Sequence, residues 1–198
     1  QVEGELRAKV EEMIESQRAV ILDKLDHPLN PEHVYMRTAS AETLEPGHHS
    51  GEKSGYTTLW ESTGAFARDL IKYGRRADDP EMLELGLAGA RLYLSPELPA
   101  LPEGKYRPGE MAHVIELMLW AREVTGDGRY LERAELFAGK ARELFFDERS
   151  PLPTIIALND YGKSKRAYQA YETVGGADDL MFALLNLHIV RERVRGSG

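Results

Sequence analysis

The fold is decided by the stretch Leu119-Trp120-Ala121-Arg122-Glu123-Val124-Thr125-Gly126-Asp127-Gly128-Arg129-Tyr130-Leu131. It reads as the end of one helix, a short acidic turn, and the start of a second helix with an apolar pair. Related stretches recur roughly every 50 residues, at Arg76-Ala77-Asp78-Asp79-Pro80 and at Gly175-Gly176-Ala177-Asp178-Asp179. A repeated helix–turn–helix unit cannot bury its apolar face alone, so we expect the copies to stack.

Apolar periodicity, capping residues and helix breakers extend this pattern along the chain. The apolar stretch 154–158 could be extended, but no second strand is evident, so we predict an all-α fold. The predicted architecture is three stacked α/α hairpins plus an N-terminal helix, an incomplete α/α toroid. We assign 1–55 to the N-terminal helix and a long loop, 56–193 to the hairpin repeat domain, and 194–198 to a tail. The expected helices are 3–26, 56–73, 79–94, 109–125, 129–146, 164–173 and 178–193.

Loop lengths alternate along the predicted hairpins. Long Pro- and Gly-containing loops at 27–55, 95–108 and 147–164 precede the hairpins, whereas short acidic turns join the two helices within each. The three long loops should therefore lie at one end of the array, and binding sites favour such loop-rich ends. The pairs Asp78-Asp79 and Asp178-Asp179 follow turns at helix starts, so we interpret them as helix caps rather than catalytic carboxylates.

Composition excludes several classes of function. The 198 residues, 42% hydrophobic and 29% charged, suit a globular domain with a core. A net charge of -8 argues against a non-specific nucleic-acid binder. No apolar run is long enough to form a membrane-spanning helix, so we predict no membrane partner. The absence of cysteine excludes disulfides, thiolate zinc sites and cysteine nucleophiles. We expect no metal and no cofactor. The sequence begins at Gln1 rather than Met, so we expect a processed or trimmed chain, and a secreted or periplasmic location is favoured.

Helical hairpins with tight Thr-Gly-Asp turns and long loops before each inner helix resemble the α/α-toroid folds of carbohydrate-active proteins. These include polysaccharide lyases and the hydrolases of unsaturated uronyl sugars. The resemblance covers 56–193, and its most similar segments are 55–61, 125–131 and 175–181. It implies a protein that acts on or binds an acidic oligo- or polysaccharide, by lyase or glycoside hydrolase chemistry if it is an enzyme. A complete toroid has more hairpins than the three expected here, which implies a fragment, a shortened toroid or an oligomer that completes the ring.

The clearest polar cluster is Tyr106-Arg107-Pro108-Gly109-Glu110-Met111-Ala112-His113. Glu110 and His113 are three residues apart on one helix face, which suits an acid/base pair, with Arg107 neutralising a substrate carboxylate. The alternative is that Glu110 interacts with the helix dipole and that His113 is hydrogen-bonded at the edge of the core. A single Glu-x-x-His copy does not make a di-iron site, which requires two copies and two further Glu.

Further candidates lie in the first loop, the second helix and the stretch 161–172. On the predicted helix 56–73, Tyr56 and Trp60 share a face and could stack on sugar rings, or else pack in the core. His49 is a candidate base or substrate contact in the loop 27–55, or a solvated loop residue. Tyrosines near Lys163, Lys165 and Arg166 suit uronate recognition, and the resemblance implies a Tyr that carries the proton, although an exposed helix start fits equally. The candidate catalytic residues are His113, Glu110 and Tyr168, and the candidate substrate-binding residues are Trp60, Tyr56, Tyr106, Arg107, His49, Tyr171 and Glu172.

Two hypotheses for function follow. The first is a carbohydrate-active enzyme or binding protein, which should gather His, Glu, Tyr and Arg side chains at one end of the helices. The second is a non-catalytic helical-repeat scaffold or binding module, which should scatter these residues and expose an apolar patch. Small residues in the helix 79–94 and the missing hairpins also predict a homo-oligomer, most simply a dimer.

Overall fold

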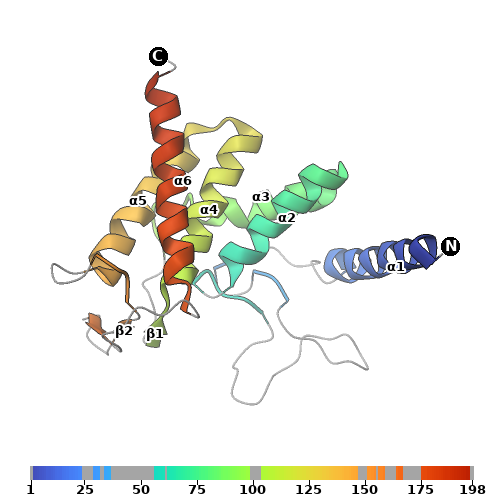
Figure 1. Cartoon of the computed structure of the whole chain (residues 1–198), viewed down its shortest axis with the longest axis horizontal. Helices are drawn as coiled ribbons and strands as arrows, with labels where there is room; N and C mark the ends of the chain where they lie inside the picture. The colour runs from blue at the N-terminus through green and yellow to red at the C-terminus, as the bar shows by residue number, and fades with distance from the viewer. Residues whose placement is uncertain are drawn as a thin grey trace. The chain divides into compact units, whose positions relative to one another are not determined.

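The computed structural model describes residues 2–23, 29–31, 34–36, 56–60, 62–98, 104–146, 151–154, 156–158, 164–166 and 175–196. The chain consists of two compact units, Gln1–Thr58 and Leu59–Gly198. Helices make up most of the described residues of both units, which confirms the all-α class (Figure 1).

The first unit contains the helix α1, Val2–Asp23, and a short pair of extended segments. Tyr56 lies opposite Met36 in an antiparallel bridge, and the Thr57 N–H donates to the Tyr35 carbonyl at 2.7 Å. The predicted helix 56–73 is therefore wrong at its start, since helix begins only at Thr63. Two β-branched residues, Thr57 and Thr58, favour extended backbone there. Tyr56 and Trp60 consequently do not share a helix face.

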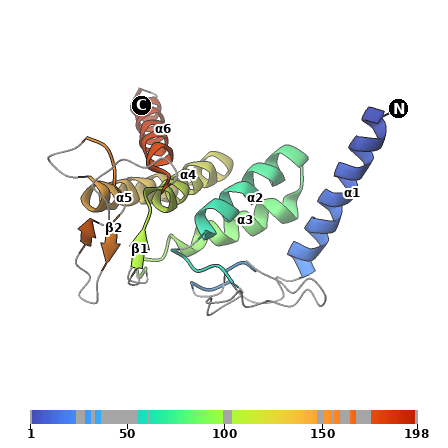
Figure 2. The same ribbon diagram turned by 60° about the horizontal axis from the view of Figure 1, so that its bottom comes forward.

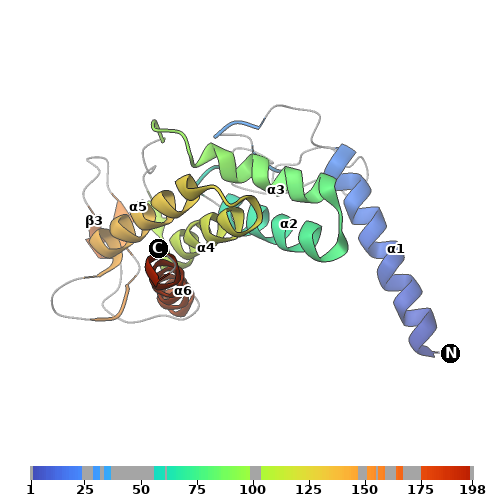
Figure 3. The same ribbon diagram turned by 90° about the horizontal axis from the view of Figure 1, so that it is seen from above.

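The described residues of the second unit form five helices in two layers. α2 (Thr63–Ala77) and α3 (Pro80–Leu92) form one antiparallel hairpin, and α4 (Pro108–Thr125) and α5 (Gly128–Phe145) form the next. α2, α4 and α6 (Ala177–Gly196) pack side by side as one layer, while α3 and α5 lie on one side of them (Figure 3). The two hairpins were predicted correctly and α3, α4 and α5 begin and end within two residues of the prediction, whereas α2 begins seven residues later than predicted.

The third predicted hairpin does not form as expected. α6 packs mainly against α4. The first residues of the two helices meet and their last turns face each other, so the two helices are parallel. α6 thus occupies the position of a first hairpin helix, equivalent to α2 and α4, rather than of a second one. Residues 164–166, predicted as the start of a helix, are a strand. The remainder of the predicted helix, 167–173, lies outside the described residues, as does residue 174.

A small antiparallel sheet adds to the helices, which corrects the expectation that no sheet would form. β1 (Gly104–Tyr106), β2 (Ile156–Leu158) and β3 (Ser164–Arg166) pair in the order β1-β2-β3. The register aligns Lys105 with Ala157 and Lys165. β1 leads directly into α4, so the sheet lies at the end of the layer where α4 begins (Figure 2). Strands of three residues carry too little periodicity to be recognised in a sequence.

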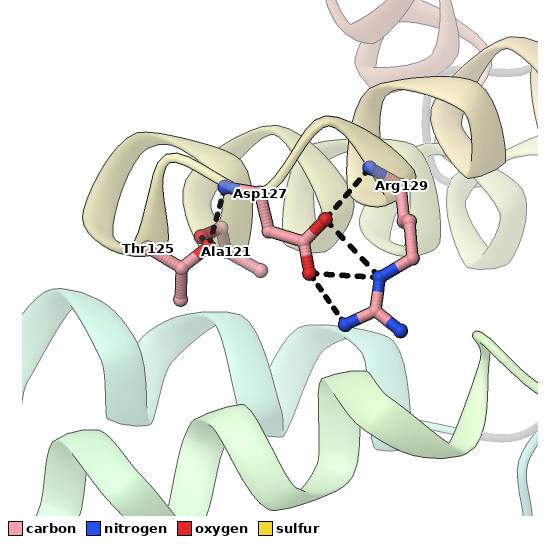
Figure 4. Close-up of polar contacts among 4 residues, drawn as sticks. All are labelled: Ala121, Thr125, Asp127 and Arg129. Carbon is pink, nitrogen blue, oxygen red and sulfur yellow. Dashed lines mark hydrogen bonds and ion pairs between the residues drawn. The ribbon is translucent and has the colours of Figure 1, made fainter.

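The acidic turns act as helix caps. Asp127 accepts from the Arg129 N–H at 2.9 Å and pairs with the Arg129 guanidinium at 2.6 Å, while the Thr125 hydroxyl donates to the Ala121 carbonyl (Figure 4). Hydrogen bonding by Arg129 lowers the pKa of Asp127 below its usual range. Asp79 caps α3 in the same way, through the N–H groups of Glu81 and Met82. The contacts of Asp79 confirm its capping interpretation, whereas Asp78 is the C-cap residue of α2, and Asp178 and Asp179 lie within the first turn of α6.

Glycines let the layers approach closely. A Cβ built on Gly86 would lie 2.7 Å from the Ala67 carbonyl oxygen, so α3 packs directly on the backbone of α2. The small residues of α3 thus serve a contact within the chain, which removes them as an argument for a dimer. The largest fully buried side chains of the second unit are Leu59, Ile71, Met82, Tyr93, Ile115, Leu117, Met118, Phe137, Phe145 and Leu180.

Candidate functional site

The first turns of α2, α4 and α6 converge at one end of the layer, and the helices fan out from it (Figure 1). Gly109 of α4 and Gly176 before α6 are so close that a Cβ on Gly176 would lie 2.4 Å from the Gly109 Cα. Gly64 of α2 packs likewise against Val114 of α4. The starts of α2, α4 and α6 therefore lie at the same end, whereas most residues of the predicted long loops 27–55, 95–108 and 147–164 lie outside the described residues.

Glu110 connects two of these helix starts. Its carboxylate accepts the backbone N–H of Ser62 at 3.1 Å, across 48 residues of sequence. Ser62 is the N-cap residue of α2 and has a left-handed backbone with φ of 60°, a conformation that non-glycine residues seldom adopt. Glu110 thus holds the entrance of α2 in place, and at least one of its oxygens has a structural partner.

His113 and Glu116, also from α4, converge on Arg68 of α2. The Arg68 Nη1 lies 3.0 Å from the His113 Nδ1 and 2.8 Å from the Glu116 Oε2, and its Nε donates to Asp69 at 3.0 Å. The Arg68 side chain is only 15% exposed, so this ion pair is better shielded from solvent than the surface pairs of the chain. Burial by itself lowers the pKa of Arg68, but hydrogen bonds and charges of Asp69 and Glu116 outweigh it and raise the pKa.

The contact with Arg68 fixes the chemistry of His113. A guanidinium only donates hydrogen bonds, so the His113 Nδ1 accepts, and in the neutral imidazole the proton resides on Nε2. Burial and the positive charge of Arg68 lower the pKa of His113 below 6.5, against the opposing charges of Glu110, Asp179 and Glu116. His113 is therefore a neutral hydrogen-bond donor near pH 7, and its one basic lone pair is occupied by Arg68.

Trp60 packs in an aromatic cluster of the core. It is 8% exposed and makes edge-to-face contacts with Tyr93 and Phe137, at centroid distances of 6.5 and 6.2 Å. The Tyr93 hydroxyl donates to the Leu59 carbonyl at 2.6 Å and fixes the cluster. This placement favours the packing alternative for Trp60 over sugar stacking.

A crevice brings Trp60, Tyr106, Arg107 and Glu110 together. Its free volume is about 10 Å³, which is roughly the space of one water molecule. Arg107 is exposed at the N-cap position of α4, whereas Tyr106 is buried. Of the predicted site residues, Trp60, Tyr106, Arg107 and Glu110 thus line this crevice, and His113 lies one turn after Glu110 on α4.

The other candidates are not joined to this group by the structure. Tyr56 belongs to the first unit, Gln1–Thr58. His49, Tyr168, Tyr171 and Glu172 lie outside the described residues, as do Tyr161 and Lys163.

Sequence reasoning missed Arg68, Glu116 and Ser62. Arg68 lies between the buried Ala67 and Ile71 on α2, so a charged residue beside a buried helical stripe was the available signal. No local pattern predicts that Ser62 would meet Glu110, because the contact depends on how the hairpins stack.

A second hollow lies between the diverging halves of α4 and α6, with a volume of about 630 Å³. On one side Trp120 of α4 lies beneath the cations of Lys72 and Arg75 of α2, at 5.4 and 5.9 Å from its ring centre. On the other side Ile189, Val190 and Val194 of α6 form an apolar wall.

Within the described part of the chain, no cluster of His, Asp and Glu side chains has the arrangement of a metal site. No described helix is long and apolar enough to cross a membrane. Comparisons with protein-family models, with curated proteins and with solved structures give no match for this chain.

Proposed function

We propose that the protein is a carbohydrate-active α/α-toroid-like protein that binds an acidic polysaccharide at the end where α2, α4 and α6 begin. The observation that carries the proposal is the convergence of the N-termini of α2, α4 and α6, next to the contacts of Glu110 with Ser62 and of His113 with Arg68. Helix N-termini carry partial positive charge and attract carboxylates.

An exposed arginine at the same end supports an anionic ligand. Arg107 lies at the N-cap position of α4 and is exposed. A guanidinium binds a uronate carboxylate through two parallel hydrogen bonds, which gives orientation as well as affinity. The net charge of -8 does not exclude an anionic ligand, because the potential at a site depends on the charges next to it.

If the protein is a lyase, the proton must be removed by a residue other than His113 in its present hydrogen-bonding state. The Nδ1 of His113 accepts from Arg68, so the Nε2–H is left to orient a substrate oxygen. Tyr168, which the resemblance implies as the proton carrier, is then the candidate base. Glu110, which holds Ser62, serves to position the helix starts around the substrate.

The experiment is a titration of the protein with a panel of acidic oligosaccharides by calorimetry, together with ultraviolet absorbance of unsaturated uronate products. We expect binding by at least one member of the panel, and Arg107→Ala to weaken it by roughly tenfold. The matched control is Arg76→Ala, an exposed arginine in the last turn of α2 at the opposite end of the helix. Absence of binding to every member, or equal effects of the two variants, would overturn the proposal. Product absorbance that disappears in Tyr168→Phe would add lyase activity.

A second candidate is a non-catalytic helical-repeat module that binds a partner through the same end. The occupied Nδ1 of His113 and the carboxylate of Glu110 held by Ser62 favour it, because both candidate catalytic groups already have structural partners. No oligosaccharide binding and no product in the same experiment is the result expected of this function.

A further inference from the structure

One face of α6 carries exposed apolar side chains. Phe182, Leu185 and Ile189 are 63%, 51% and 39% exposed, and their spacing of three and four residues aligns them in one stripe. The buried residues of the helix, Ala177, Leu180, Ala183 and Leu187, lie on the opposite face. α4 packs against a helix of its layer on each side, whereas the described residues place no helix against this stripe of α6.

Charged residues of opposite sign stand at the two ends of the stripe. Asp178, four residues before Phe182, lies in the first turn of α6, and Arg193, four residues after Ile189, lies in the last. The order along the face is therefore acidic, three apolar residues, basic. Such a face is complementary to itself when a second copy is turned around, because the acidic end of one helix then meets the basic end of the other.

The spacing sets a register for that pairing. If Asp178 lies opposite the partner's Arg193, then Phe182 lies opposite the partner's Ile189, and Leu185 lies beside the twofold axis. Ile189 also lines the hollow of about 630 Å³ between α4 and α6, so each Phe182 would reach the edge of the hollow in the other copy. The antiparallel arrangement also opposes the two helix dipoles, which is favourable.

We propose that the protein forms a symmetric dimer in which α6 pairs antiparallel with α6 of a second copy. The pairing covers the stripe of Phe182, Leu185 and Ile189 and closes an Asp178–Arg193 ion pair at each end. It leaves the start of α4 and its polar group outside the proposed contact residues, so it does not depend on the ligand proposed above.

The first test is sedimentation of the full chain from about 1 to about 100 µM, a range that resolves dimers of ordinary affinity. We expect a species of twice the 22.3 kDa mass of the chain at the upper end. Leu185→Glu places two like charges at the twofold axis and should abolish it. Leu136→Glu on α5, a leucine of similar exposure, is the matched control and should leave the dimer intact. A monomer at every concentration, or a dimer that survives Leu185→Glu, overturns the proposal.

A charge exchange tests the orientation. Asp178→Arg and Arg193→Asp should each weaken the dimer by roughly tenfold, and the double exchange should restore it to within about threefold of the original, since both ion pairs re-form with reversed sign. Circular dichroism of each variant checks that α6 still folds. Failure of the double exchange to restore dimerisation while helicity is retained excludes the antiparallel register.

Cysteine cross-linking provides an independent readout, because the natural chain has no cysteine. A mixture of Phe182→Cys and Ile189→Cys chains should cross-link to each other on mild oxidation far more than either chain links to itself. Predominant Phe182→Cys self-linking would indicate a parallel pair and would overturn the proposal. Equal yields in all combinations would indicate random encounters and would overturn it as well.

Discussion

The hydrogen bond between Glu110 and the Ser62 N–H predicts a structural cost at the scale of single residues. Glu110→Ala leaves this N–H, which sits in a strained left-handed residue, without its acceptor, so we expect a loss of about 1–3 kcal/mol in the free energy of unfolding. Glu110→Gln keeps an acceptor oxygen and should lose less. Urea denaturation measures both.

The control for this prediction is Glu143→Ala on α5, since Glu143 is an exposed helical glutamate. Its effect should stay within about 0.5 kcal/mol, as for most surface substitutions. Equal stabilities of the Glu110→Ala and Glu143→Ala proteins would contradict the structural role of Glu110.

His113 predicts a pH dependence of stability whose sign follows from its pKa. Because burial and Arg68 lower the pKa of His113 in the folded protein below the ordinary 6.5, the unfolded chain binds a proton first as the pH falls. The contribution of His113 is therefore constant above pH 6.5, and stability is lost as the pH falls from 6.5 towards the lowered pKa.

The measurement is the urea midpoint at a series of pH values across this window. His113→Asn retains an acceptor for Arg68 but has no titration, so its acid-side loss should be smaller than in the natural protein. His188→Asn, at an exposed position on α6, should keep the full loss. An unchanged pH profile in His113→Asn would show that other groups cause the dependence.

At the residue scale, contacts between residues close in sequence could be predicted, whereas contacts between residues far apart in sequence could not. The caps formed by Asp79 and Asp127 follow from residues two or three positions away, so the sequence alone predicts them. The face shared by Glu110 and His113 follows from helical spacing. Their partners Ser62 and Arg68 come from 48 and 45 residues away, and only the stacking of hairpins brings them together.

At the scale of elements, the close contact of α2 and α3 predicts that replacing Gly86 of α3 by Ala destabilises the protein. Gly86→Ala brings a methyl group within 2.7 Å of the Ala67 carbonyl oxygen, a backbone atom that moves only with its helix. We expect a loss of about 1–3 kcal/mol in unfolding free energy despite the better helix propensity of Ala.

Gly139→Ala on α5 is the matched control, since nothing lies within 4 Å of the added methyl group. It should stabilise the protein by about 0.5–1 kcal/mol through helix propensity. Thermal denaturation of the two variants tests the pair, and a Gly86→Ala protein as stable as Gly139→Ala would show that the layers can separate freely.

The success of the element predictions depended on length. Helices of thirteen residues or more carry several turns of periodicity together with a cap, and α3, α4 and α5 were found within two residues of their ends. The three-residue strands carry no comparable signal. The stretch 175–179 resembles the other acidic turns in composition, but the helix that follows it, α6, occupies the position of a first hairpin helix. The composition of a turn does not determine which layer the next helix joins, so the sequence could not predict this.

At the scale of the whole second unit, α6 is held by fewer contacts than the other helices of its layer. It packs against α4 along one face and touches α5 only slightly, whereas α4 lies between α2, α5 and α6. Local opening free energies follow the number of buried contacts, so α6 should be the first helix of this layer to detach.

Gly176 allows this order of opening to be tested. It has φ of 75°, and a Cβ there would lie 2.4 Å from the Gly109 Cα, so Gly176→Ala combines backbone strain with a clash that must push α6 away from α4. Gly126→Ala is the matched control, because Gly126 has φ of 73° but open space around its Cα. We expect hydrogen exchange of the α6 amides to accelerate in Gly176→Ala while the α2–α3 hairpin keeps its protection. In Gly126→Ala the exchange of α6 should be unchanged. Uniform acceleration in all helices of Gly176→Ala would mean instead that α6 and the two hairpins open as one cooperative unit.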